Sequence, residues 1–227
     1  MLLEIVPGLY KLQRAANIYV LDNDEITVID TGMPGATRAI LKAVAELGRE
    51  PQDVRHILIT HADFDHIGSV AGLVEATGAA VYASEAAAHY MSSPEAPPHG
   101  SLPLIEPMMR AGFKLMIKPF APDFTVKDGD MLDIAGGIRV IATPGHTPDN
   151  ISFYWERRRV LFCADLIMNM DRLVLTPKRI SHNLEAAKRS ARKVLALDPA
   201  VIAVGHGKPF YVQDAPGEID VFLKTLV

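Results

Sequence analysis

The string His61-Ala62-Asp63-Phe64-Asp65-His66 places four metal-binding side chains within six residues. Imidazole nitrogens and carboxylate oxygens are protein ligands for zinc, iron and manganese. Two carboxylates held this close together repel each other, and each raises the pKa of the other unless a cation lies between them. Four such positions arise by chance in about one chain of this length in a thousand. The string therefore predicts a metal site.

Three further motifs carry residues of the same chemical types. They are Thr143-Pro144-Gly145-His146-Thr147-Pro148, Cys163-Ala164-Asp165 and Gly205-His206-Gly207. Each motif follows a run of residues typical of a buried strand, so His146, Asp165 and His206 are expected at strand ends. If the strands form two paired sheets, loops at one edge would bring these side chains to the first string.

The elements that must position these motifs are strands and helices in mixed order. In the first half we expect a hairpin of 17–21 and 25–29, a helix at 36–47, a strand at 55–60, a helix at 66–77 and a strand at 79–83. In the second half we expect strands at 131–134, 138–142, 151–155, 160–164 and 201–204, and helices at 184–197 and 218–226. This order predicts an α+β fold with two sheets, helices outside them, and two pseudo-duplicated halves.

Residues 84–124 interrupt the regular pattern. Seven of the sixteen prolines lie between Pro94 and Pro122, and four of the nine methionines lie between Met91 and Met116. Proline breaks regular elements, so we expect an irregular insertion of short helices over the cleft that holds the motifs. The whole chain, residues 1–227, is expected to form a single domain.

Taken together, these motifs resemble those of the metallo-β-lactamase superfamily of metallohydrolases, which are H-x-H-x-D-H, a later His, a bridging Asp and a final His. The similarity extends from Asp30-Thr31-Gly32 to Gly205-His206-Gly207 and implies a four-layer αββα sandwich. The ligands that it implies are His61, Asp63 and His146 for one divalent metal, Asp65, His66 and His206 for a second, and Asp165 as the bridge. It also implies that Asp30 and Thr60 orient the ligand turn.

Asp63 departs from the superfamily pattern, which usually has histidine at this position. A carboxylate adds a negative charge and reaches less far than an imidazole. Carboxylate-rich ligand sets accept iron and manganese better than all-imidazole sets do. The resemblance favours zinc, whereas Asp63 also suits iron or manganese. We expect the site that contains Asp63 to bind its metal more weakly than the other site.

The predicted chemistry is hydrolysis of a small ester, thioester, lactone or amide. A hydroxide that bridges two metals would be the nucleophile, and Asp65 would hold it and pass its proton to the leaving group. One alternative on the same fold is a non-haem iron redox enzyme that reduces oxygen or nitric oxide or oxidises persulfides, because the carboxylate of Asp63 suits iron. A phosphodiesterase is a further alternative.

Several residues outside the ligand set are candidates for the substrate pocket. Met168 and Asn169 follow the bridging aspartate closely, and His99 and His182 are further candidates. Lactonases of the superfamily have a tyrosine just past the bridging aspartate, and the matching residue here is Met168, which weakens a lactonase assignment. Cys163 lies in an apolar run, so we expect it in the core rather than in the chemistry.

Composition limits the partners that we expect. The chain has 23 Lys and Arg against 27 Asp and Glu, a formal charge of −4, which disfavours nucleic acid as a partner. No apolar run reaches the ~18 residues that span a membrane, and the N-terminus does not resemble a secretory signal. With one cysteine, we expect a cytoplasmic enzyme with a small-molecule substrate. An exposed apolar insertion would favour a homodimer.

Overall fold

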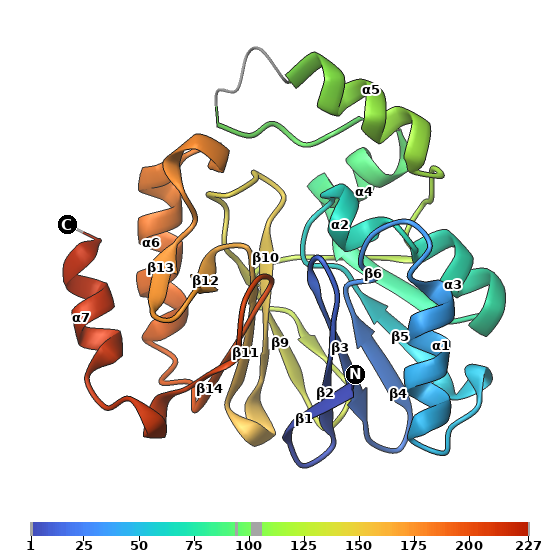
Figure 1. Cartoon of the computed structure of the whole chain (residues 1–227), viewed down its shortest axis with the longest axis horizontal. Coiled ribbons are helices and arrows are strands. Elements are labelled where there is room, and N and C mark those ends of the chain that lie inside the picture. The colour runs from blue at the N-terminus through green and yellow to red at the C-terminus, as the bar shows by residue number, and fades with distance from the viewer. Residues whose placement is uncertain (1, 94, 101–105, 227) are drawn as a thin grey trace. The chain divides into compact units, whose positions relative to one another are not determined.

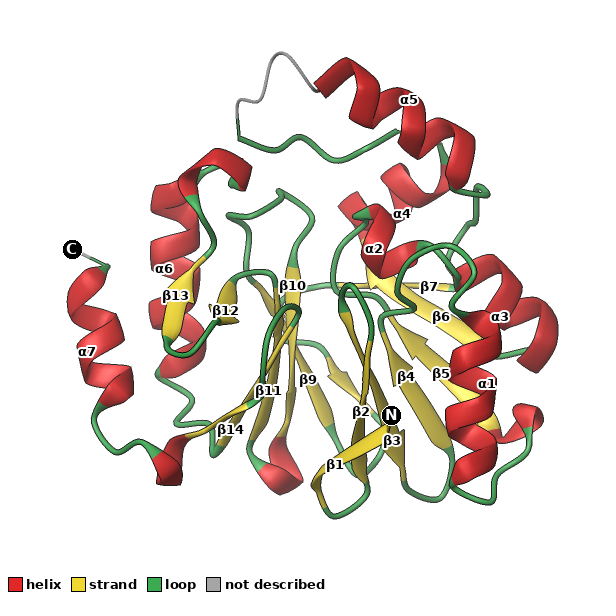
Figure 2. Cartoon of the chain, in the orientation of Figure 1, coloured by secondary structure: helices red, strands yellow, loops and turns green. Residues whose placement is uncertain are grey.

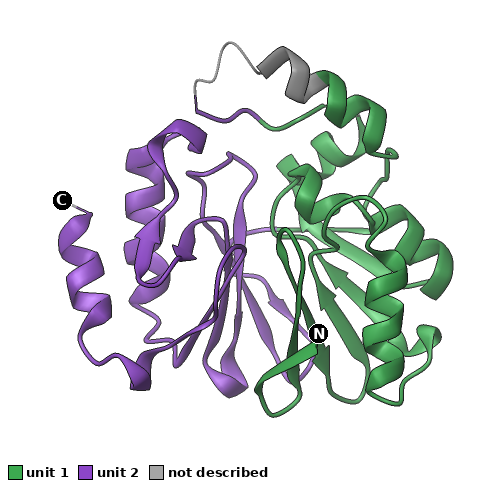
Figure 3. Ribbon diagram, viewed as in Figure 1, with its two compact units in different colours: residues 1–97, 104–126 green, residues 98–103, 127–227 purple. Residues whose placement is uncertain are grey.

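The computed structural model describes residues 2–93, 95–100 and 106–226 (Figure 1). The chain divides into two compact units, coloured separately in Figure 3. Unit 1 comprises residues 1–97 and 104–126, and unit 2 comprises residues 98–103 and 127–227. Each unit has its own sheet and its own buried core. The single domain over residues 1–227 stays a prediction.

Unit 1 is built on a seven-stranded mixed sheet. Its strands, in sheet order, are β1 (Leu2–Val6), β2 (Leu9–Gln13), β3 (Asn17–Asp22), β4 (Ile26–Ile29), β5 (Val54–Leu58), β6 (Ala80–Ser84) and β7 (Phe124–Val126). Strands β1 to β4 pair antiparallel, and β4 to β7 pair parallel. In the parallel part Ile29 is opposite Leu58, so β4 and β5 end together at one edge. The segments that follow them therefore begin side by side.

The helices of unit 1 are α1 (Thr37–Glu46), α2 (Phe64–Ile67), α3 (Val70–Thr77), α4 (Glu85–Ser92) and α5 (Glu106–Met116), with a 3-10 turn at Pro51–Asp53. Helices α1 and α3 lie against one face of the sheet (Figure 2). Ile40 of α1 and Leu73 of α3 are fully buried in one cluster with Val28 and Ile57 of the strands. Burying a side chain of this size stabilises a fold by about 1.5–3 kcal/mol.

Two helical regions of unit 1 differ from the sequence expectation. The single helix predicted at 66–77 is two helices, which break at Gly68 and Ser69. The break accommodates a close backbone approach, because a Cβ on Gly68 would lie 2.3 Å from the backbone nitrogen of Pro34. Within 84–124 the chain is more regular than its proline content suggests. Pro107 lies in the first turn of the 11-residue α5, where a backbone N–H is not needed.

Unit 2 contains a six-stranded mixed sheet and a two-stranded sheet. The larger sheet has the order β15 (Phe210–Tyr211), β14 (Val201–Val204), β11 (Val160–Ala164), β10 (Ile151–Trp155), β9 (Ile138–Ala142) and β8 (Met131–Leu132). The smaller sheet pairs β12 (Ile167–Asn169) with β13 (Leu173–Leu175). Strands β11 and β14 are parallel, and Ala164 is opposite Val204. As in unit 1, two parallel strands end together at one edge.

The helices of unit 2 are α6 (Leu184–Leu195) and α7 (Glu218–Thr225), with 3-10 turns at Glu156–Arg158, Lys178–Ile180 and Val212–Asp214. One side of α6 is buried, and Ala187, Ala191 and Val194 pack in a cluster with Leu161 and Ile202 of the sheet. The larger sheet of each unit and the helices around it confirm the α+β prediction. Among the residues that the structure describes, the helices are too short or too polar to cross a membrane.

Candidate metal centre

The unit 1 cluster consists of His61 and Asp63, in the turn after β5, and of Asp65 and His66, in α2. Nε2 of His61 lies 3.5 Å from Oδ2 of Asp63, and the rings of His61 and His66 have centroids 4.1 Å apart. Ligand atoms of Asp65 and His66 lie within 4.8 Å of each other. Both imidazoles are fully buried, Asp63 is buried and Asp65 is half-buried. Four side chains of the predicted string therefore converge within this unit.

Asp30 contacts this cluster from the end of β4. Its Oδ2 lies 2.8 Å from Nδ1 of His66, and its carboxylate accepts hydrogen bonds from the backbone N–H and the hydroxyl of Thr60. The hydroxyl oxygen of Thr60 lies 3.0 Å from Nδ1 of His61. Asp30 has a φ of 59°, the left-handed conformation that non-glycine residues adopt rarely and often at functional sites. The two predicted orienting residues thus contact both imidazoles.

These contacts define which nitrogen of each histidine can bind a metal. A carboxylate only accepts, so Nδ1 of His66 must donate to Asp30. The hydroxyl of Thr60 donates its one proton to Asp30, so its oxygen accepts from Nδ1–H of His61. In both rings the lone pair is then on Nε2. A hydrogen bond to the ring nitrogen that does not bind the metal fixes the tautomer and the orientation of a metal-binding histidine.

The loop of residues 31–36 anchors the turn that carries His66. The backbone N–H and the hydroxyl of Thr31 both donate to the carbonyl oxygen of His66, at 2.7 and 2.9 Å. The hydroxyl of Ser69 donates to the carbonyl of Met33 and accepts from the backbone N–H of Ala36. The break between α2 and α3 is therefore bonded to this loop at several points.

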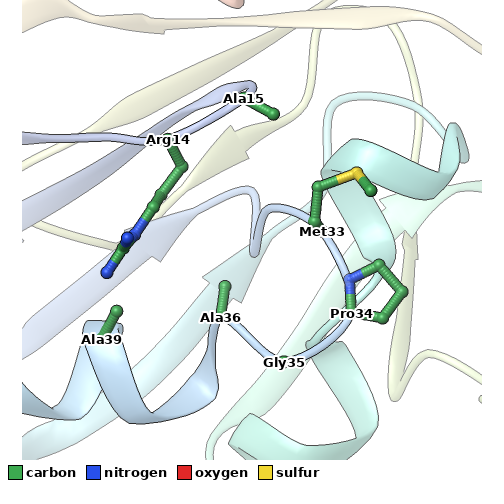
Figure 4. A pocket seen from close by; sticks show the side chains of 7 residues that line it. All are labelled: Arg14, Ala15, Met33, Pro34, Gly35, Ala36 and Ala39. Atoms are coloured by element: carbon green, nitrogen blue, oxygen red, sulfur yellow. The ribbon is translucent and has the colours of Figure 1, made fainter.

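A hollow of about 240 Å³ borders the same loop (Figure 4). Its lining residues are Arg14, Ala15, Met33, Pro34, Gly35, Ala36 and Ala39. Arg14, between β2 and β3, supplies the one charged side chain of this lining, and a guanidinium attracts anionic groups. No sequence motif marks this hollow, since its residues are brought together from two separate segments.

The unit 2 cluster consists of His146, Asp165 and His206. Oδ2 of Asp165 lies 3.1 Å from Nε2 of His206 and 3.8 Å from Nε2 of His146. His146 and Asp165 are buried, and His206 is half-buried. Asp165 follows β11 and His206 follows β14, so the paired ends of these strands place both side chains at one edge. The three predicted residues of this half therefore converge as well.

Gly205 makes room for the carboxylate of Asp165. A Cβ at position 205 would lie 2.0 Å from Oδ1 of Asp165. The backbone N–H of Gly205 donates to the carbonyl of Ala164, whose φ is 49°. Only glycine fits such an approach without displacing the aspartate. The glycine before His206 thus has a physical role that its motif alone did not explain.

The turn that carries His146 is hydrogen-bonded to the residues just before α6. The backbone N–H groups of His182 and Asn183 donate to the carbonyls of His146 and Gly145, at 2.8 and 2.9 Å. Ala187 of α6 comes so close that a Cβ on Gly145 would lie 2.4 Å from its Cα. Glycine at position 145 therefore lets the turn pack directly on the helix.

The three predicted pocket residues, Met168, Asn169 and His182, differ in burial and in their contacts. Met168 is buried in β12, and His182 has an exposed side chain next to its backbone contact with His146. The side-chain amide of Asn169 donates to the carbonyl of Lys208. The backbone of Asn169 also forms a β-bridge with Gly207, the residue after His206. These contacts stabilise the loop that carries His206. Substrate contact by these residues stays a prediction.

His99, from the insertion, packs on a member of the unit 2 cluster. Its ring centroid lies 5.3 Å from that of His146, with the rings inclined by 67°. The neighbouring Gly100 lies against the backbone of Arg179, where a Cβ would be 2.6 Å from the carbonyl oxygen. His99 is half-buried. His99 belongs to unit 2, so this contact lies within that unit.

The donor atoms fit a divalent first-row metal. Both clusters offer imidazole nitrogen and carboxylate oxygen on largely buried side chains, which is the ligand chemistry of zinc, iron and manganese sites. Cys163 is fully buried, and burial raises the pKa of its thiol to about 12. The thiol therefore stays protonated near neutral pH and is neither a ligand nor a nucleophile.

A further residue of unit 2, Thr176, contacts His146 without any sequence motif to mark it. The hydroxyl oxygen of Thr176 lies 3.2 Å from Nδ1 of His146, and Thr176 is buried. The two residues are 30 positions apart, and no motif surrounds Thr176. By contrast, Thr60 stands next to His61 and belongs to the end of a predicted strand.

Comparison with known proteins identifies the family. The profile of the metallo-beta-lactamase superfamily matches residues 13–206. A probable metallo-hydrolase of Bacillus subtilis (strain 168) is 26% identical, over 91% of this chain and 86% of that protein. A hydroxyacylglutathione hydrolase of Methylobacterium nodulans is 29% identical, over 86% of this chain and 64% of that protein. The crystal structure of a metallo-beta-lactamase family protein of Thermus thermophilus has a TM-score of 0.75 and 25% identity, over 98% of this chain and 79% of that chain.

These similarities confirm the predicted resemblance and the predicted fold. They also confirm the expectation of a metal-dependent hydrolase at the level of the superfamily. The profile match covers most of the chain, from the end of β2 to the last predicted ligand. The chain therefore belongs to the metallo-beta-lactamase superfamily.

Proposed function

We propose that this protein is a dinuclear hydrolase of a small ester, thioester, lactone or amide. The observation that carries the proposal is the position of Asp165, whose Oδ2 lies 3.1 Å from Nε2 of His206 and 3.8 Å from Nε2 of His146. These two histidines are assigned to different metals by the resemblance to the superfamily. A carboxylate beside a ligand nitrogen of each site suits a ligand that two cations share.

The proposed ligands come from both units, and their pairing comes from the resemblance to the superfamily. One site takes His61, Asp63 and His146, the other takes Asp65, His66 and His206, and Asp165 serves both. The contacts of Asp30 and Thr60 support this set, because they leave Nε2 of both unit 1 histidines as the lone-pair nitrogen.

Asp65 is the proposed acid–base residue. Bound divalent metals would supply an activated water near neutral pH and polarise the scissile carbonyl. Asp65 lies in the first turn of α2, half-buried, with a carboxylate oxygen within 4.8 Å of a ring nitrogen of His66. From there its carboxylate would accept the proton of the attacking water and give it to the leaving group.

The metals that the proposed sites bind are not fixed by the proposed reaction, and Asp63 bears on their identity. The superfamily resemblance supports zinc, and a carboxylate at this position also suits iron or manganese. The same residue supports the second candidate function, a non-haem iron redox enzyme. A phosphodiesterase needs the same ligands and differs only in the substrate that it accepts.

The substrate class is proposed from the relatives as well as from the site. The similarity to a hydroxyacylglutathione hydrolase supports thioesters as a class to test first. This chain covers 64% of the length of that relative, so the specific substrate is part of the test.

The test starts from protein purified without added metal. Metal content is measured by mass spectrometry, and activity is measured on a panel of thioesters, esters, lactones, amides and phosphodiesters, together with oxygen consumption. We expect divalent metal in the protein, hydrolysis of a member of the first four classes, and loss of hydrolysis on chelation. Stoichiometric iron with oxygen consumption and no hydrolysis would support the redox alternative instead.

Two histidine variants test whether the proposed metal site is needed for hydrolysis. His206→Ala removes a proposed ligand and is expected to abolish hydrolysis and lower metal content. His89→Ala changes an exposed histidine of α4 that packs on Tyr90, and it is expected to behave as the unaltered protein. Full hydrolytic activity of His206→Ala would remove the proposed site from the mechanism.

A further inference from the structure

We infer that Thr176 is a positioning residue, whose hydroxyl orients the ring of His146 so that Nε2 is presented as a metal ligand. This inference rests on the proposed function, because it takes His146 as a ligand. The hydroxyl oxygen of Thr176 lies 3.2 Å from Nδ1 of His146. Both side chains are buried, at 1% and 3% exposure, so water does not compete for this contact.

The backbone of Thr176 contacts the segment that carries Asp165, and its side chain contacts His146. Thr176 follows β13, and its N–H donates to the carbonyl of Leu166, the residue after Asp165. Its side chain reaches His146, which stands on a different turn. Thr176 therefore links the segment of one proposed ligand to the ring of another.

Ser181 lies beside the hydroxyl of Thr176. The hydroxyl of Ser181 lies within hydrogen-bond distance of the hydroxyl and the carbonyl oxygen of Thr176, both at 3.3 Å, and of the carbonyl of Pro177, at 3.0 Å. A hydroxyl oxygen has two lone pairs, so Thr176 can accept from Ser181 and from Nδ1–H of His146 together. With the proton on Nδ1, the lone pair of His146 is on Nε2, the atom that faces Asp165.

The same arrangement occurs in unit 1. There a threonine hydroxyl, that of Thr60, lies 3.0 Å from Nδ1 of His61. The two contacts share the residue type, the ring atom and burial, although Thr60 is next to its histidine and Thr176 is 30 residues away. Each unit therefore uses a buried threonine to direct one imidazole, and the loss of such a contact typically weakens metal binding by about 10- to 100-fold.

The test compares Thr176→Val, Thr176→Ser and Thr27→Val. Valine keeps the shape of threonine and removes the hydroxyl, whereas serine keeps the hydroxyl. Thr27 in β4 is buried to the same 1% and lies in the other unit, so Thr27→Val controls for burying a methyl group in place of a hydroxyl. Metal-stripped protein is titrated with Zn²⁺ against a chromophoric chelator, and the melting temperature of the metal-free protein is recorded.

We expect Thr176→Val to lower the affinity for one of the bound Zn²⁺ ions by about 10- to 100-fold. Thr176→Ser and Thr27→Val should bind Zn²⁺ with the affinity of the unaltered protein. The melting temperatures of the metal-free valine variants should fall by similar amounts. Unchanged Zn²⁺ affinity of Thr176→Val, or equally weak binding by Thr176→Ser, would overturn the inference. The same titration is run with Mn²⁺ and Fe²⁺. If the unaltered protein binds none of the three metals, the proposed function fails, whereas binding that Thr176→Val leaves unchanged overturns only the inference.

Discussion

Asp63 makes the unit 1 cluster richer in carboxylate than the usual superfamily pattern. It stands at the residue before α2, 3.5 Å from Nε2 of His61, and is buried. A third imidazole in its place would be a softer ligand that reaches further toward a metal, and softer sets favour zinc. Metal preference can therefore be tested by one substitution.

Asp63→His is expected to increase the zinc retained per chain after dialysis and to lower the retention of iron or manganese. Asp24→His, in an exposed turn, makes the same change in charge away from the cluster and should leave metal content unchanged. Metal analysis after competitive loading measures both variants. Equal and tight occupancy of two sites in the unaltered protein would contradict the weaker site that we expect around Asp63.

Gly205→Ala is expected to displace Asp165 and so to reduce metal binding. The new Cβ would lie 2.0 Å from Oδ1 of Asp165 and 2.9 Å from the backbone of Ala164. Gly112→Ala, in α5, is the control, because its Cβ would meet only Met116 Cε at 3.8 Å. That change should be neutral or stabilise the protein by up to about 1 kcal/mol. Metal content and urea unfolding distinguish the two variants.

An Asp165→Ala background shows whether the carboxylate causes the effect of Gly205→Ala. Because the clashing oxygen is then absent, Gly205→Ala should lower the free energy of unfolding by less in that background than in the unaltered chain. Equal losses in both backgrounds would mean that the contact with Ala164 alone is responsible.

At the scale of elements, each unit presents its cluster where two parallel strands end together. In unit 1 these strands are β4 and β5, which lead into Asp30 and the His61 turn. In unit 2 they are β11 and β14, which lead into Asp165 and His206. A left-handed residue stands at each exit, Asp30 with φ 59° and Ala164 with φ 49°. Strained backbone conformations of this kind cluster at functional sites.

Ser69→Ala tests how the loop of residues 31–36 supports the His66 turn. The hydroxyl of Ser69 bonds the carbonyl of Met33 and the N–H of Ala36, so alanine leaves two backbone groups without this partner. We expect a loss of about 1–3 kcal/mol in the free energy of unfolding. Ser92→Ala, which removes an exposed hydroxyl of α4, should change it by less than about 0.5 kcal/mol. Similar urea curves for both variants would contradict this account.

At the scale of the whole molecule, Cys163 is a built-in reporter of unfolding. It is fully buried in the core of unit 2, and desolvation raises the pKa of its thiol to about 12. A thiol reagent at pH 8 should therefore label the native protein only as fast as the chain opens. Rapid labelling before any loss of circular dichroism would show that Cys163 is accessible in the native state.

The raised pKa of Cys163 also predicts a pH dependence of stability. Because the folded pKa is above the ordinary value of 9.0, the unfolded thiol ionises first as the pH rises. The contribution of this group is complete below pH 9 and falls as the pH rises from 9 toward 12. Cys163→Ala should reduce the slope of stability against pH in this range, as measured by urea unfolding. An unchanged slope would mean that other groups cause it.

Local spacing made much of the candidate site predictable. His61, Asp63, Asp65 and His66 lie within six residues, at the end of one turn and the start of α2, so neighbours in sequence are neighbours in space. The alternation of apolar strands and turns likewise placed His146, Asp165 and His206 after strands. Short elements such as β12 and β13 carry too few residues for such a pattern and were not predicted.

The residue types of the candidate metal ligands, the superfamily and the strands before these residues depend on local order along the chain, so they could be predicted from the sequence. The contact of Thr176 with His146 and the space that Gly205 leaves for Asp165 depend on tertiary packing, so they became visible only in the folded chain. The same is true of the break at Gly68, which follows from the close approach of Pro34. These contacts join residues 30 to 40 positions apart, and their distances depend on how strands pair and turns pack, which no local pattern encodes.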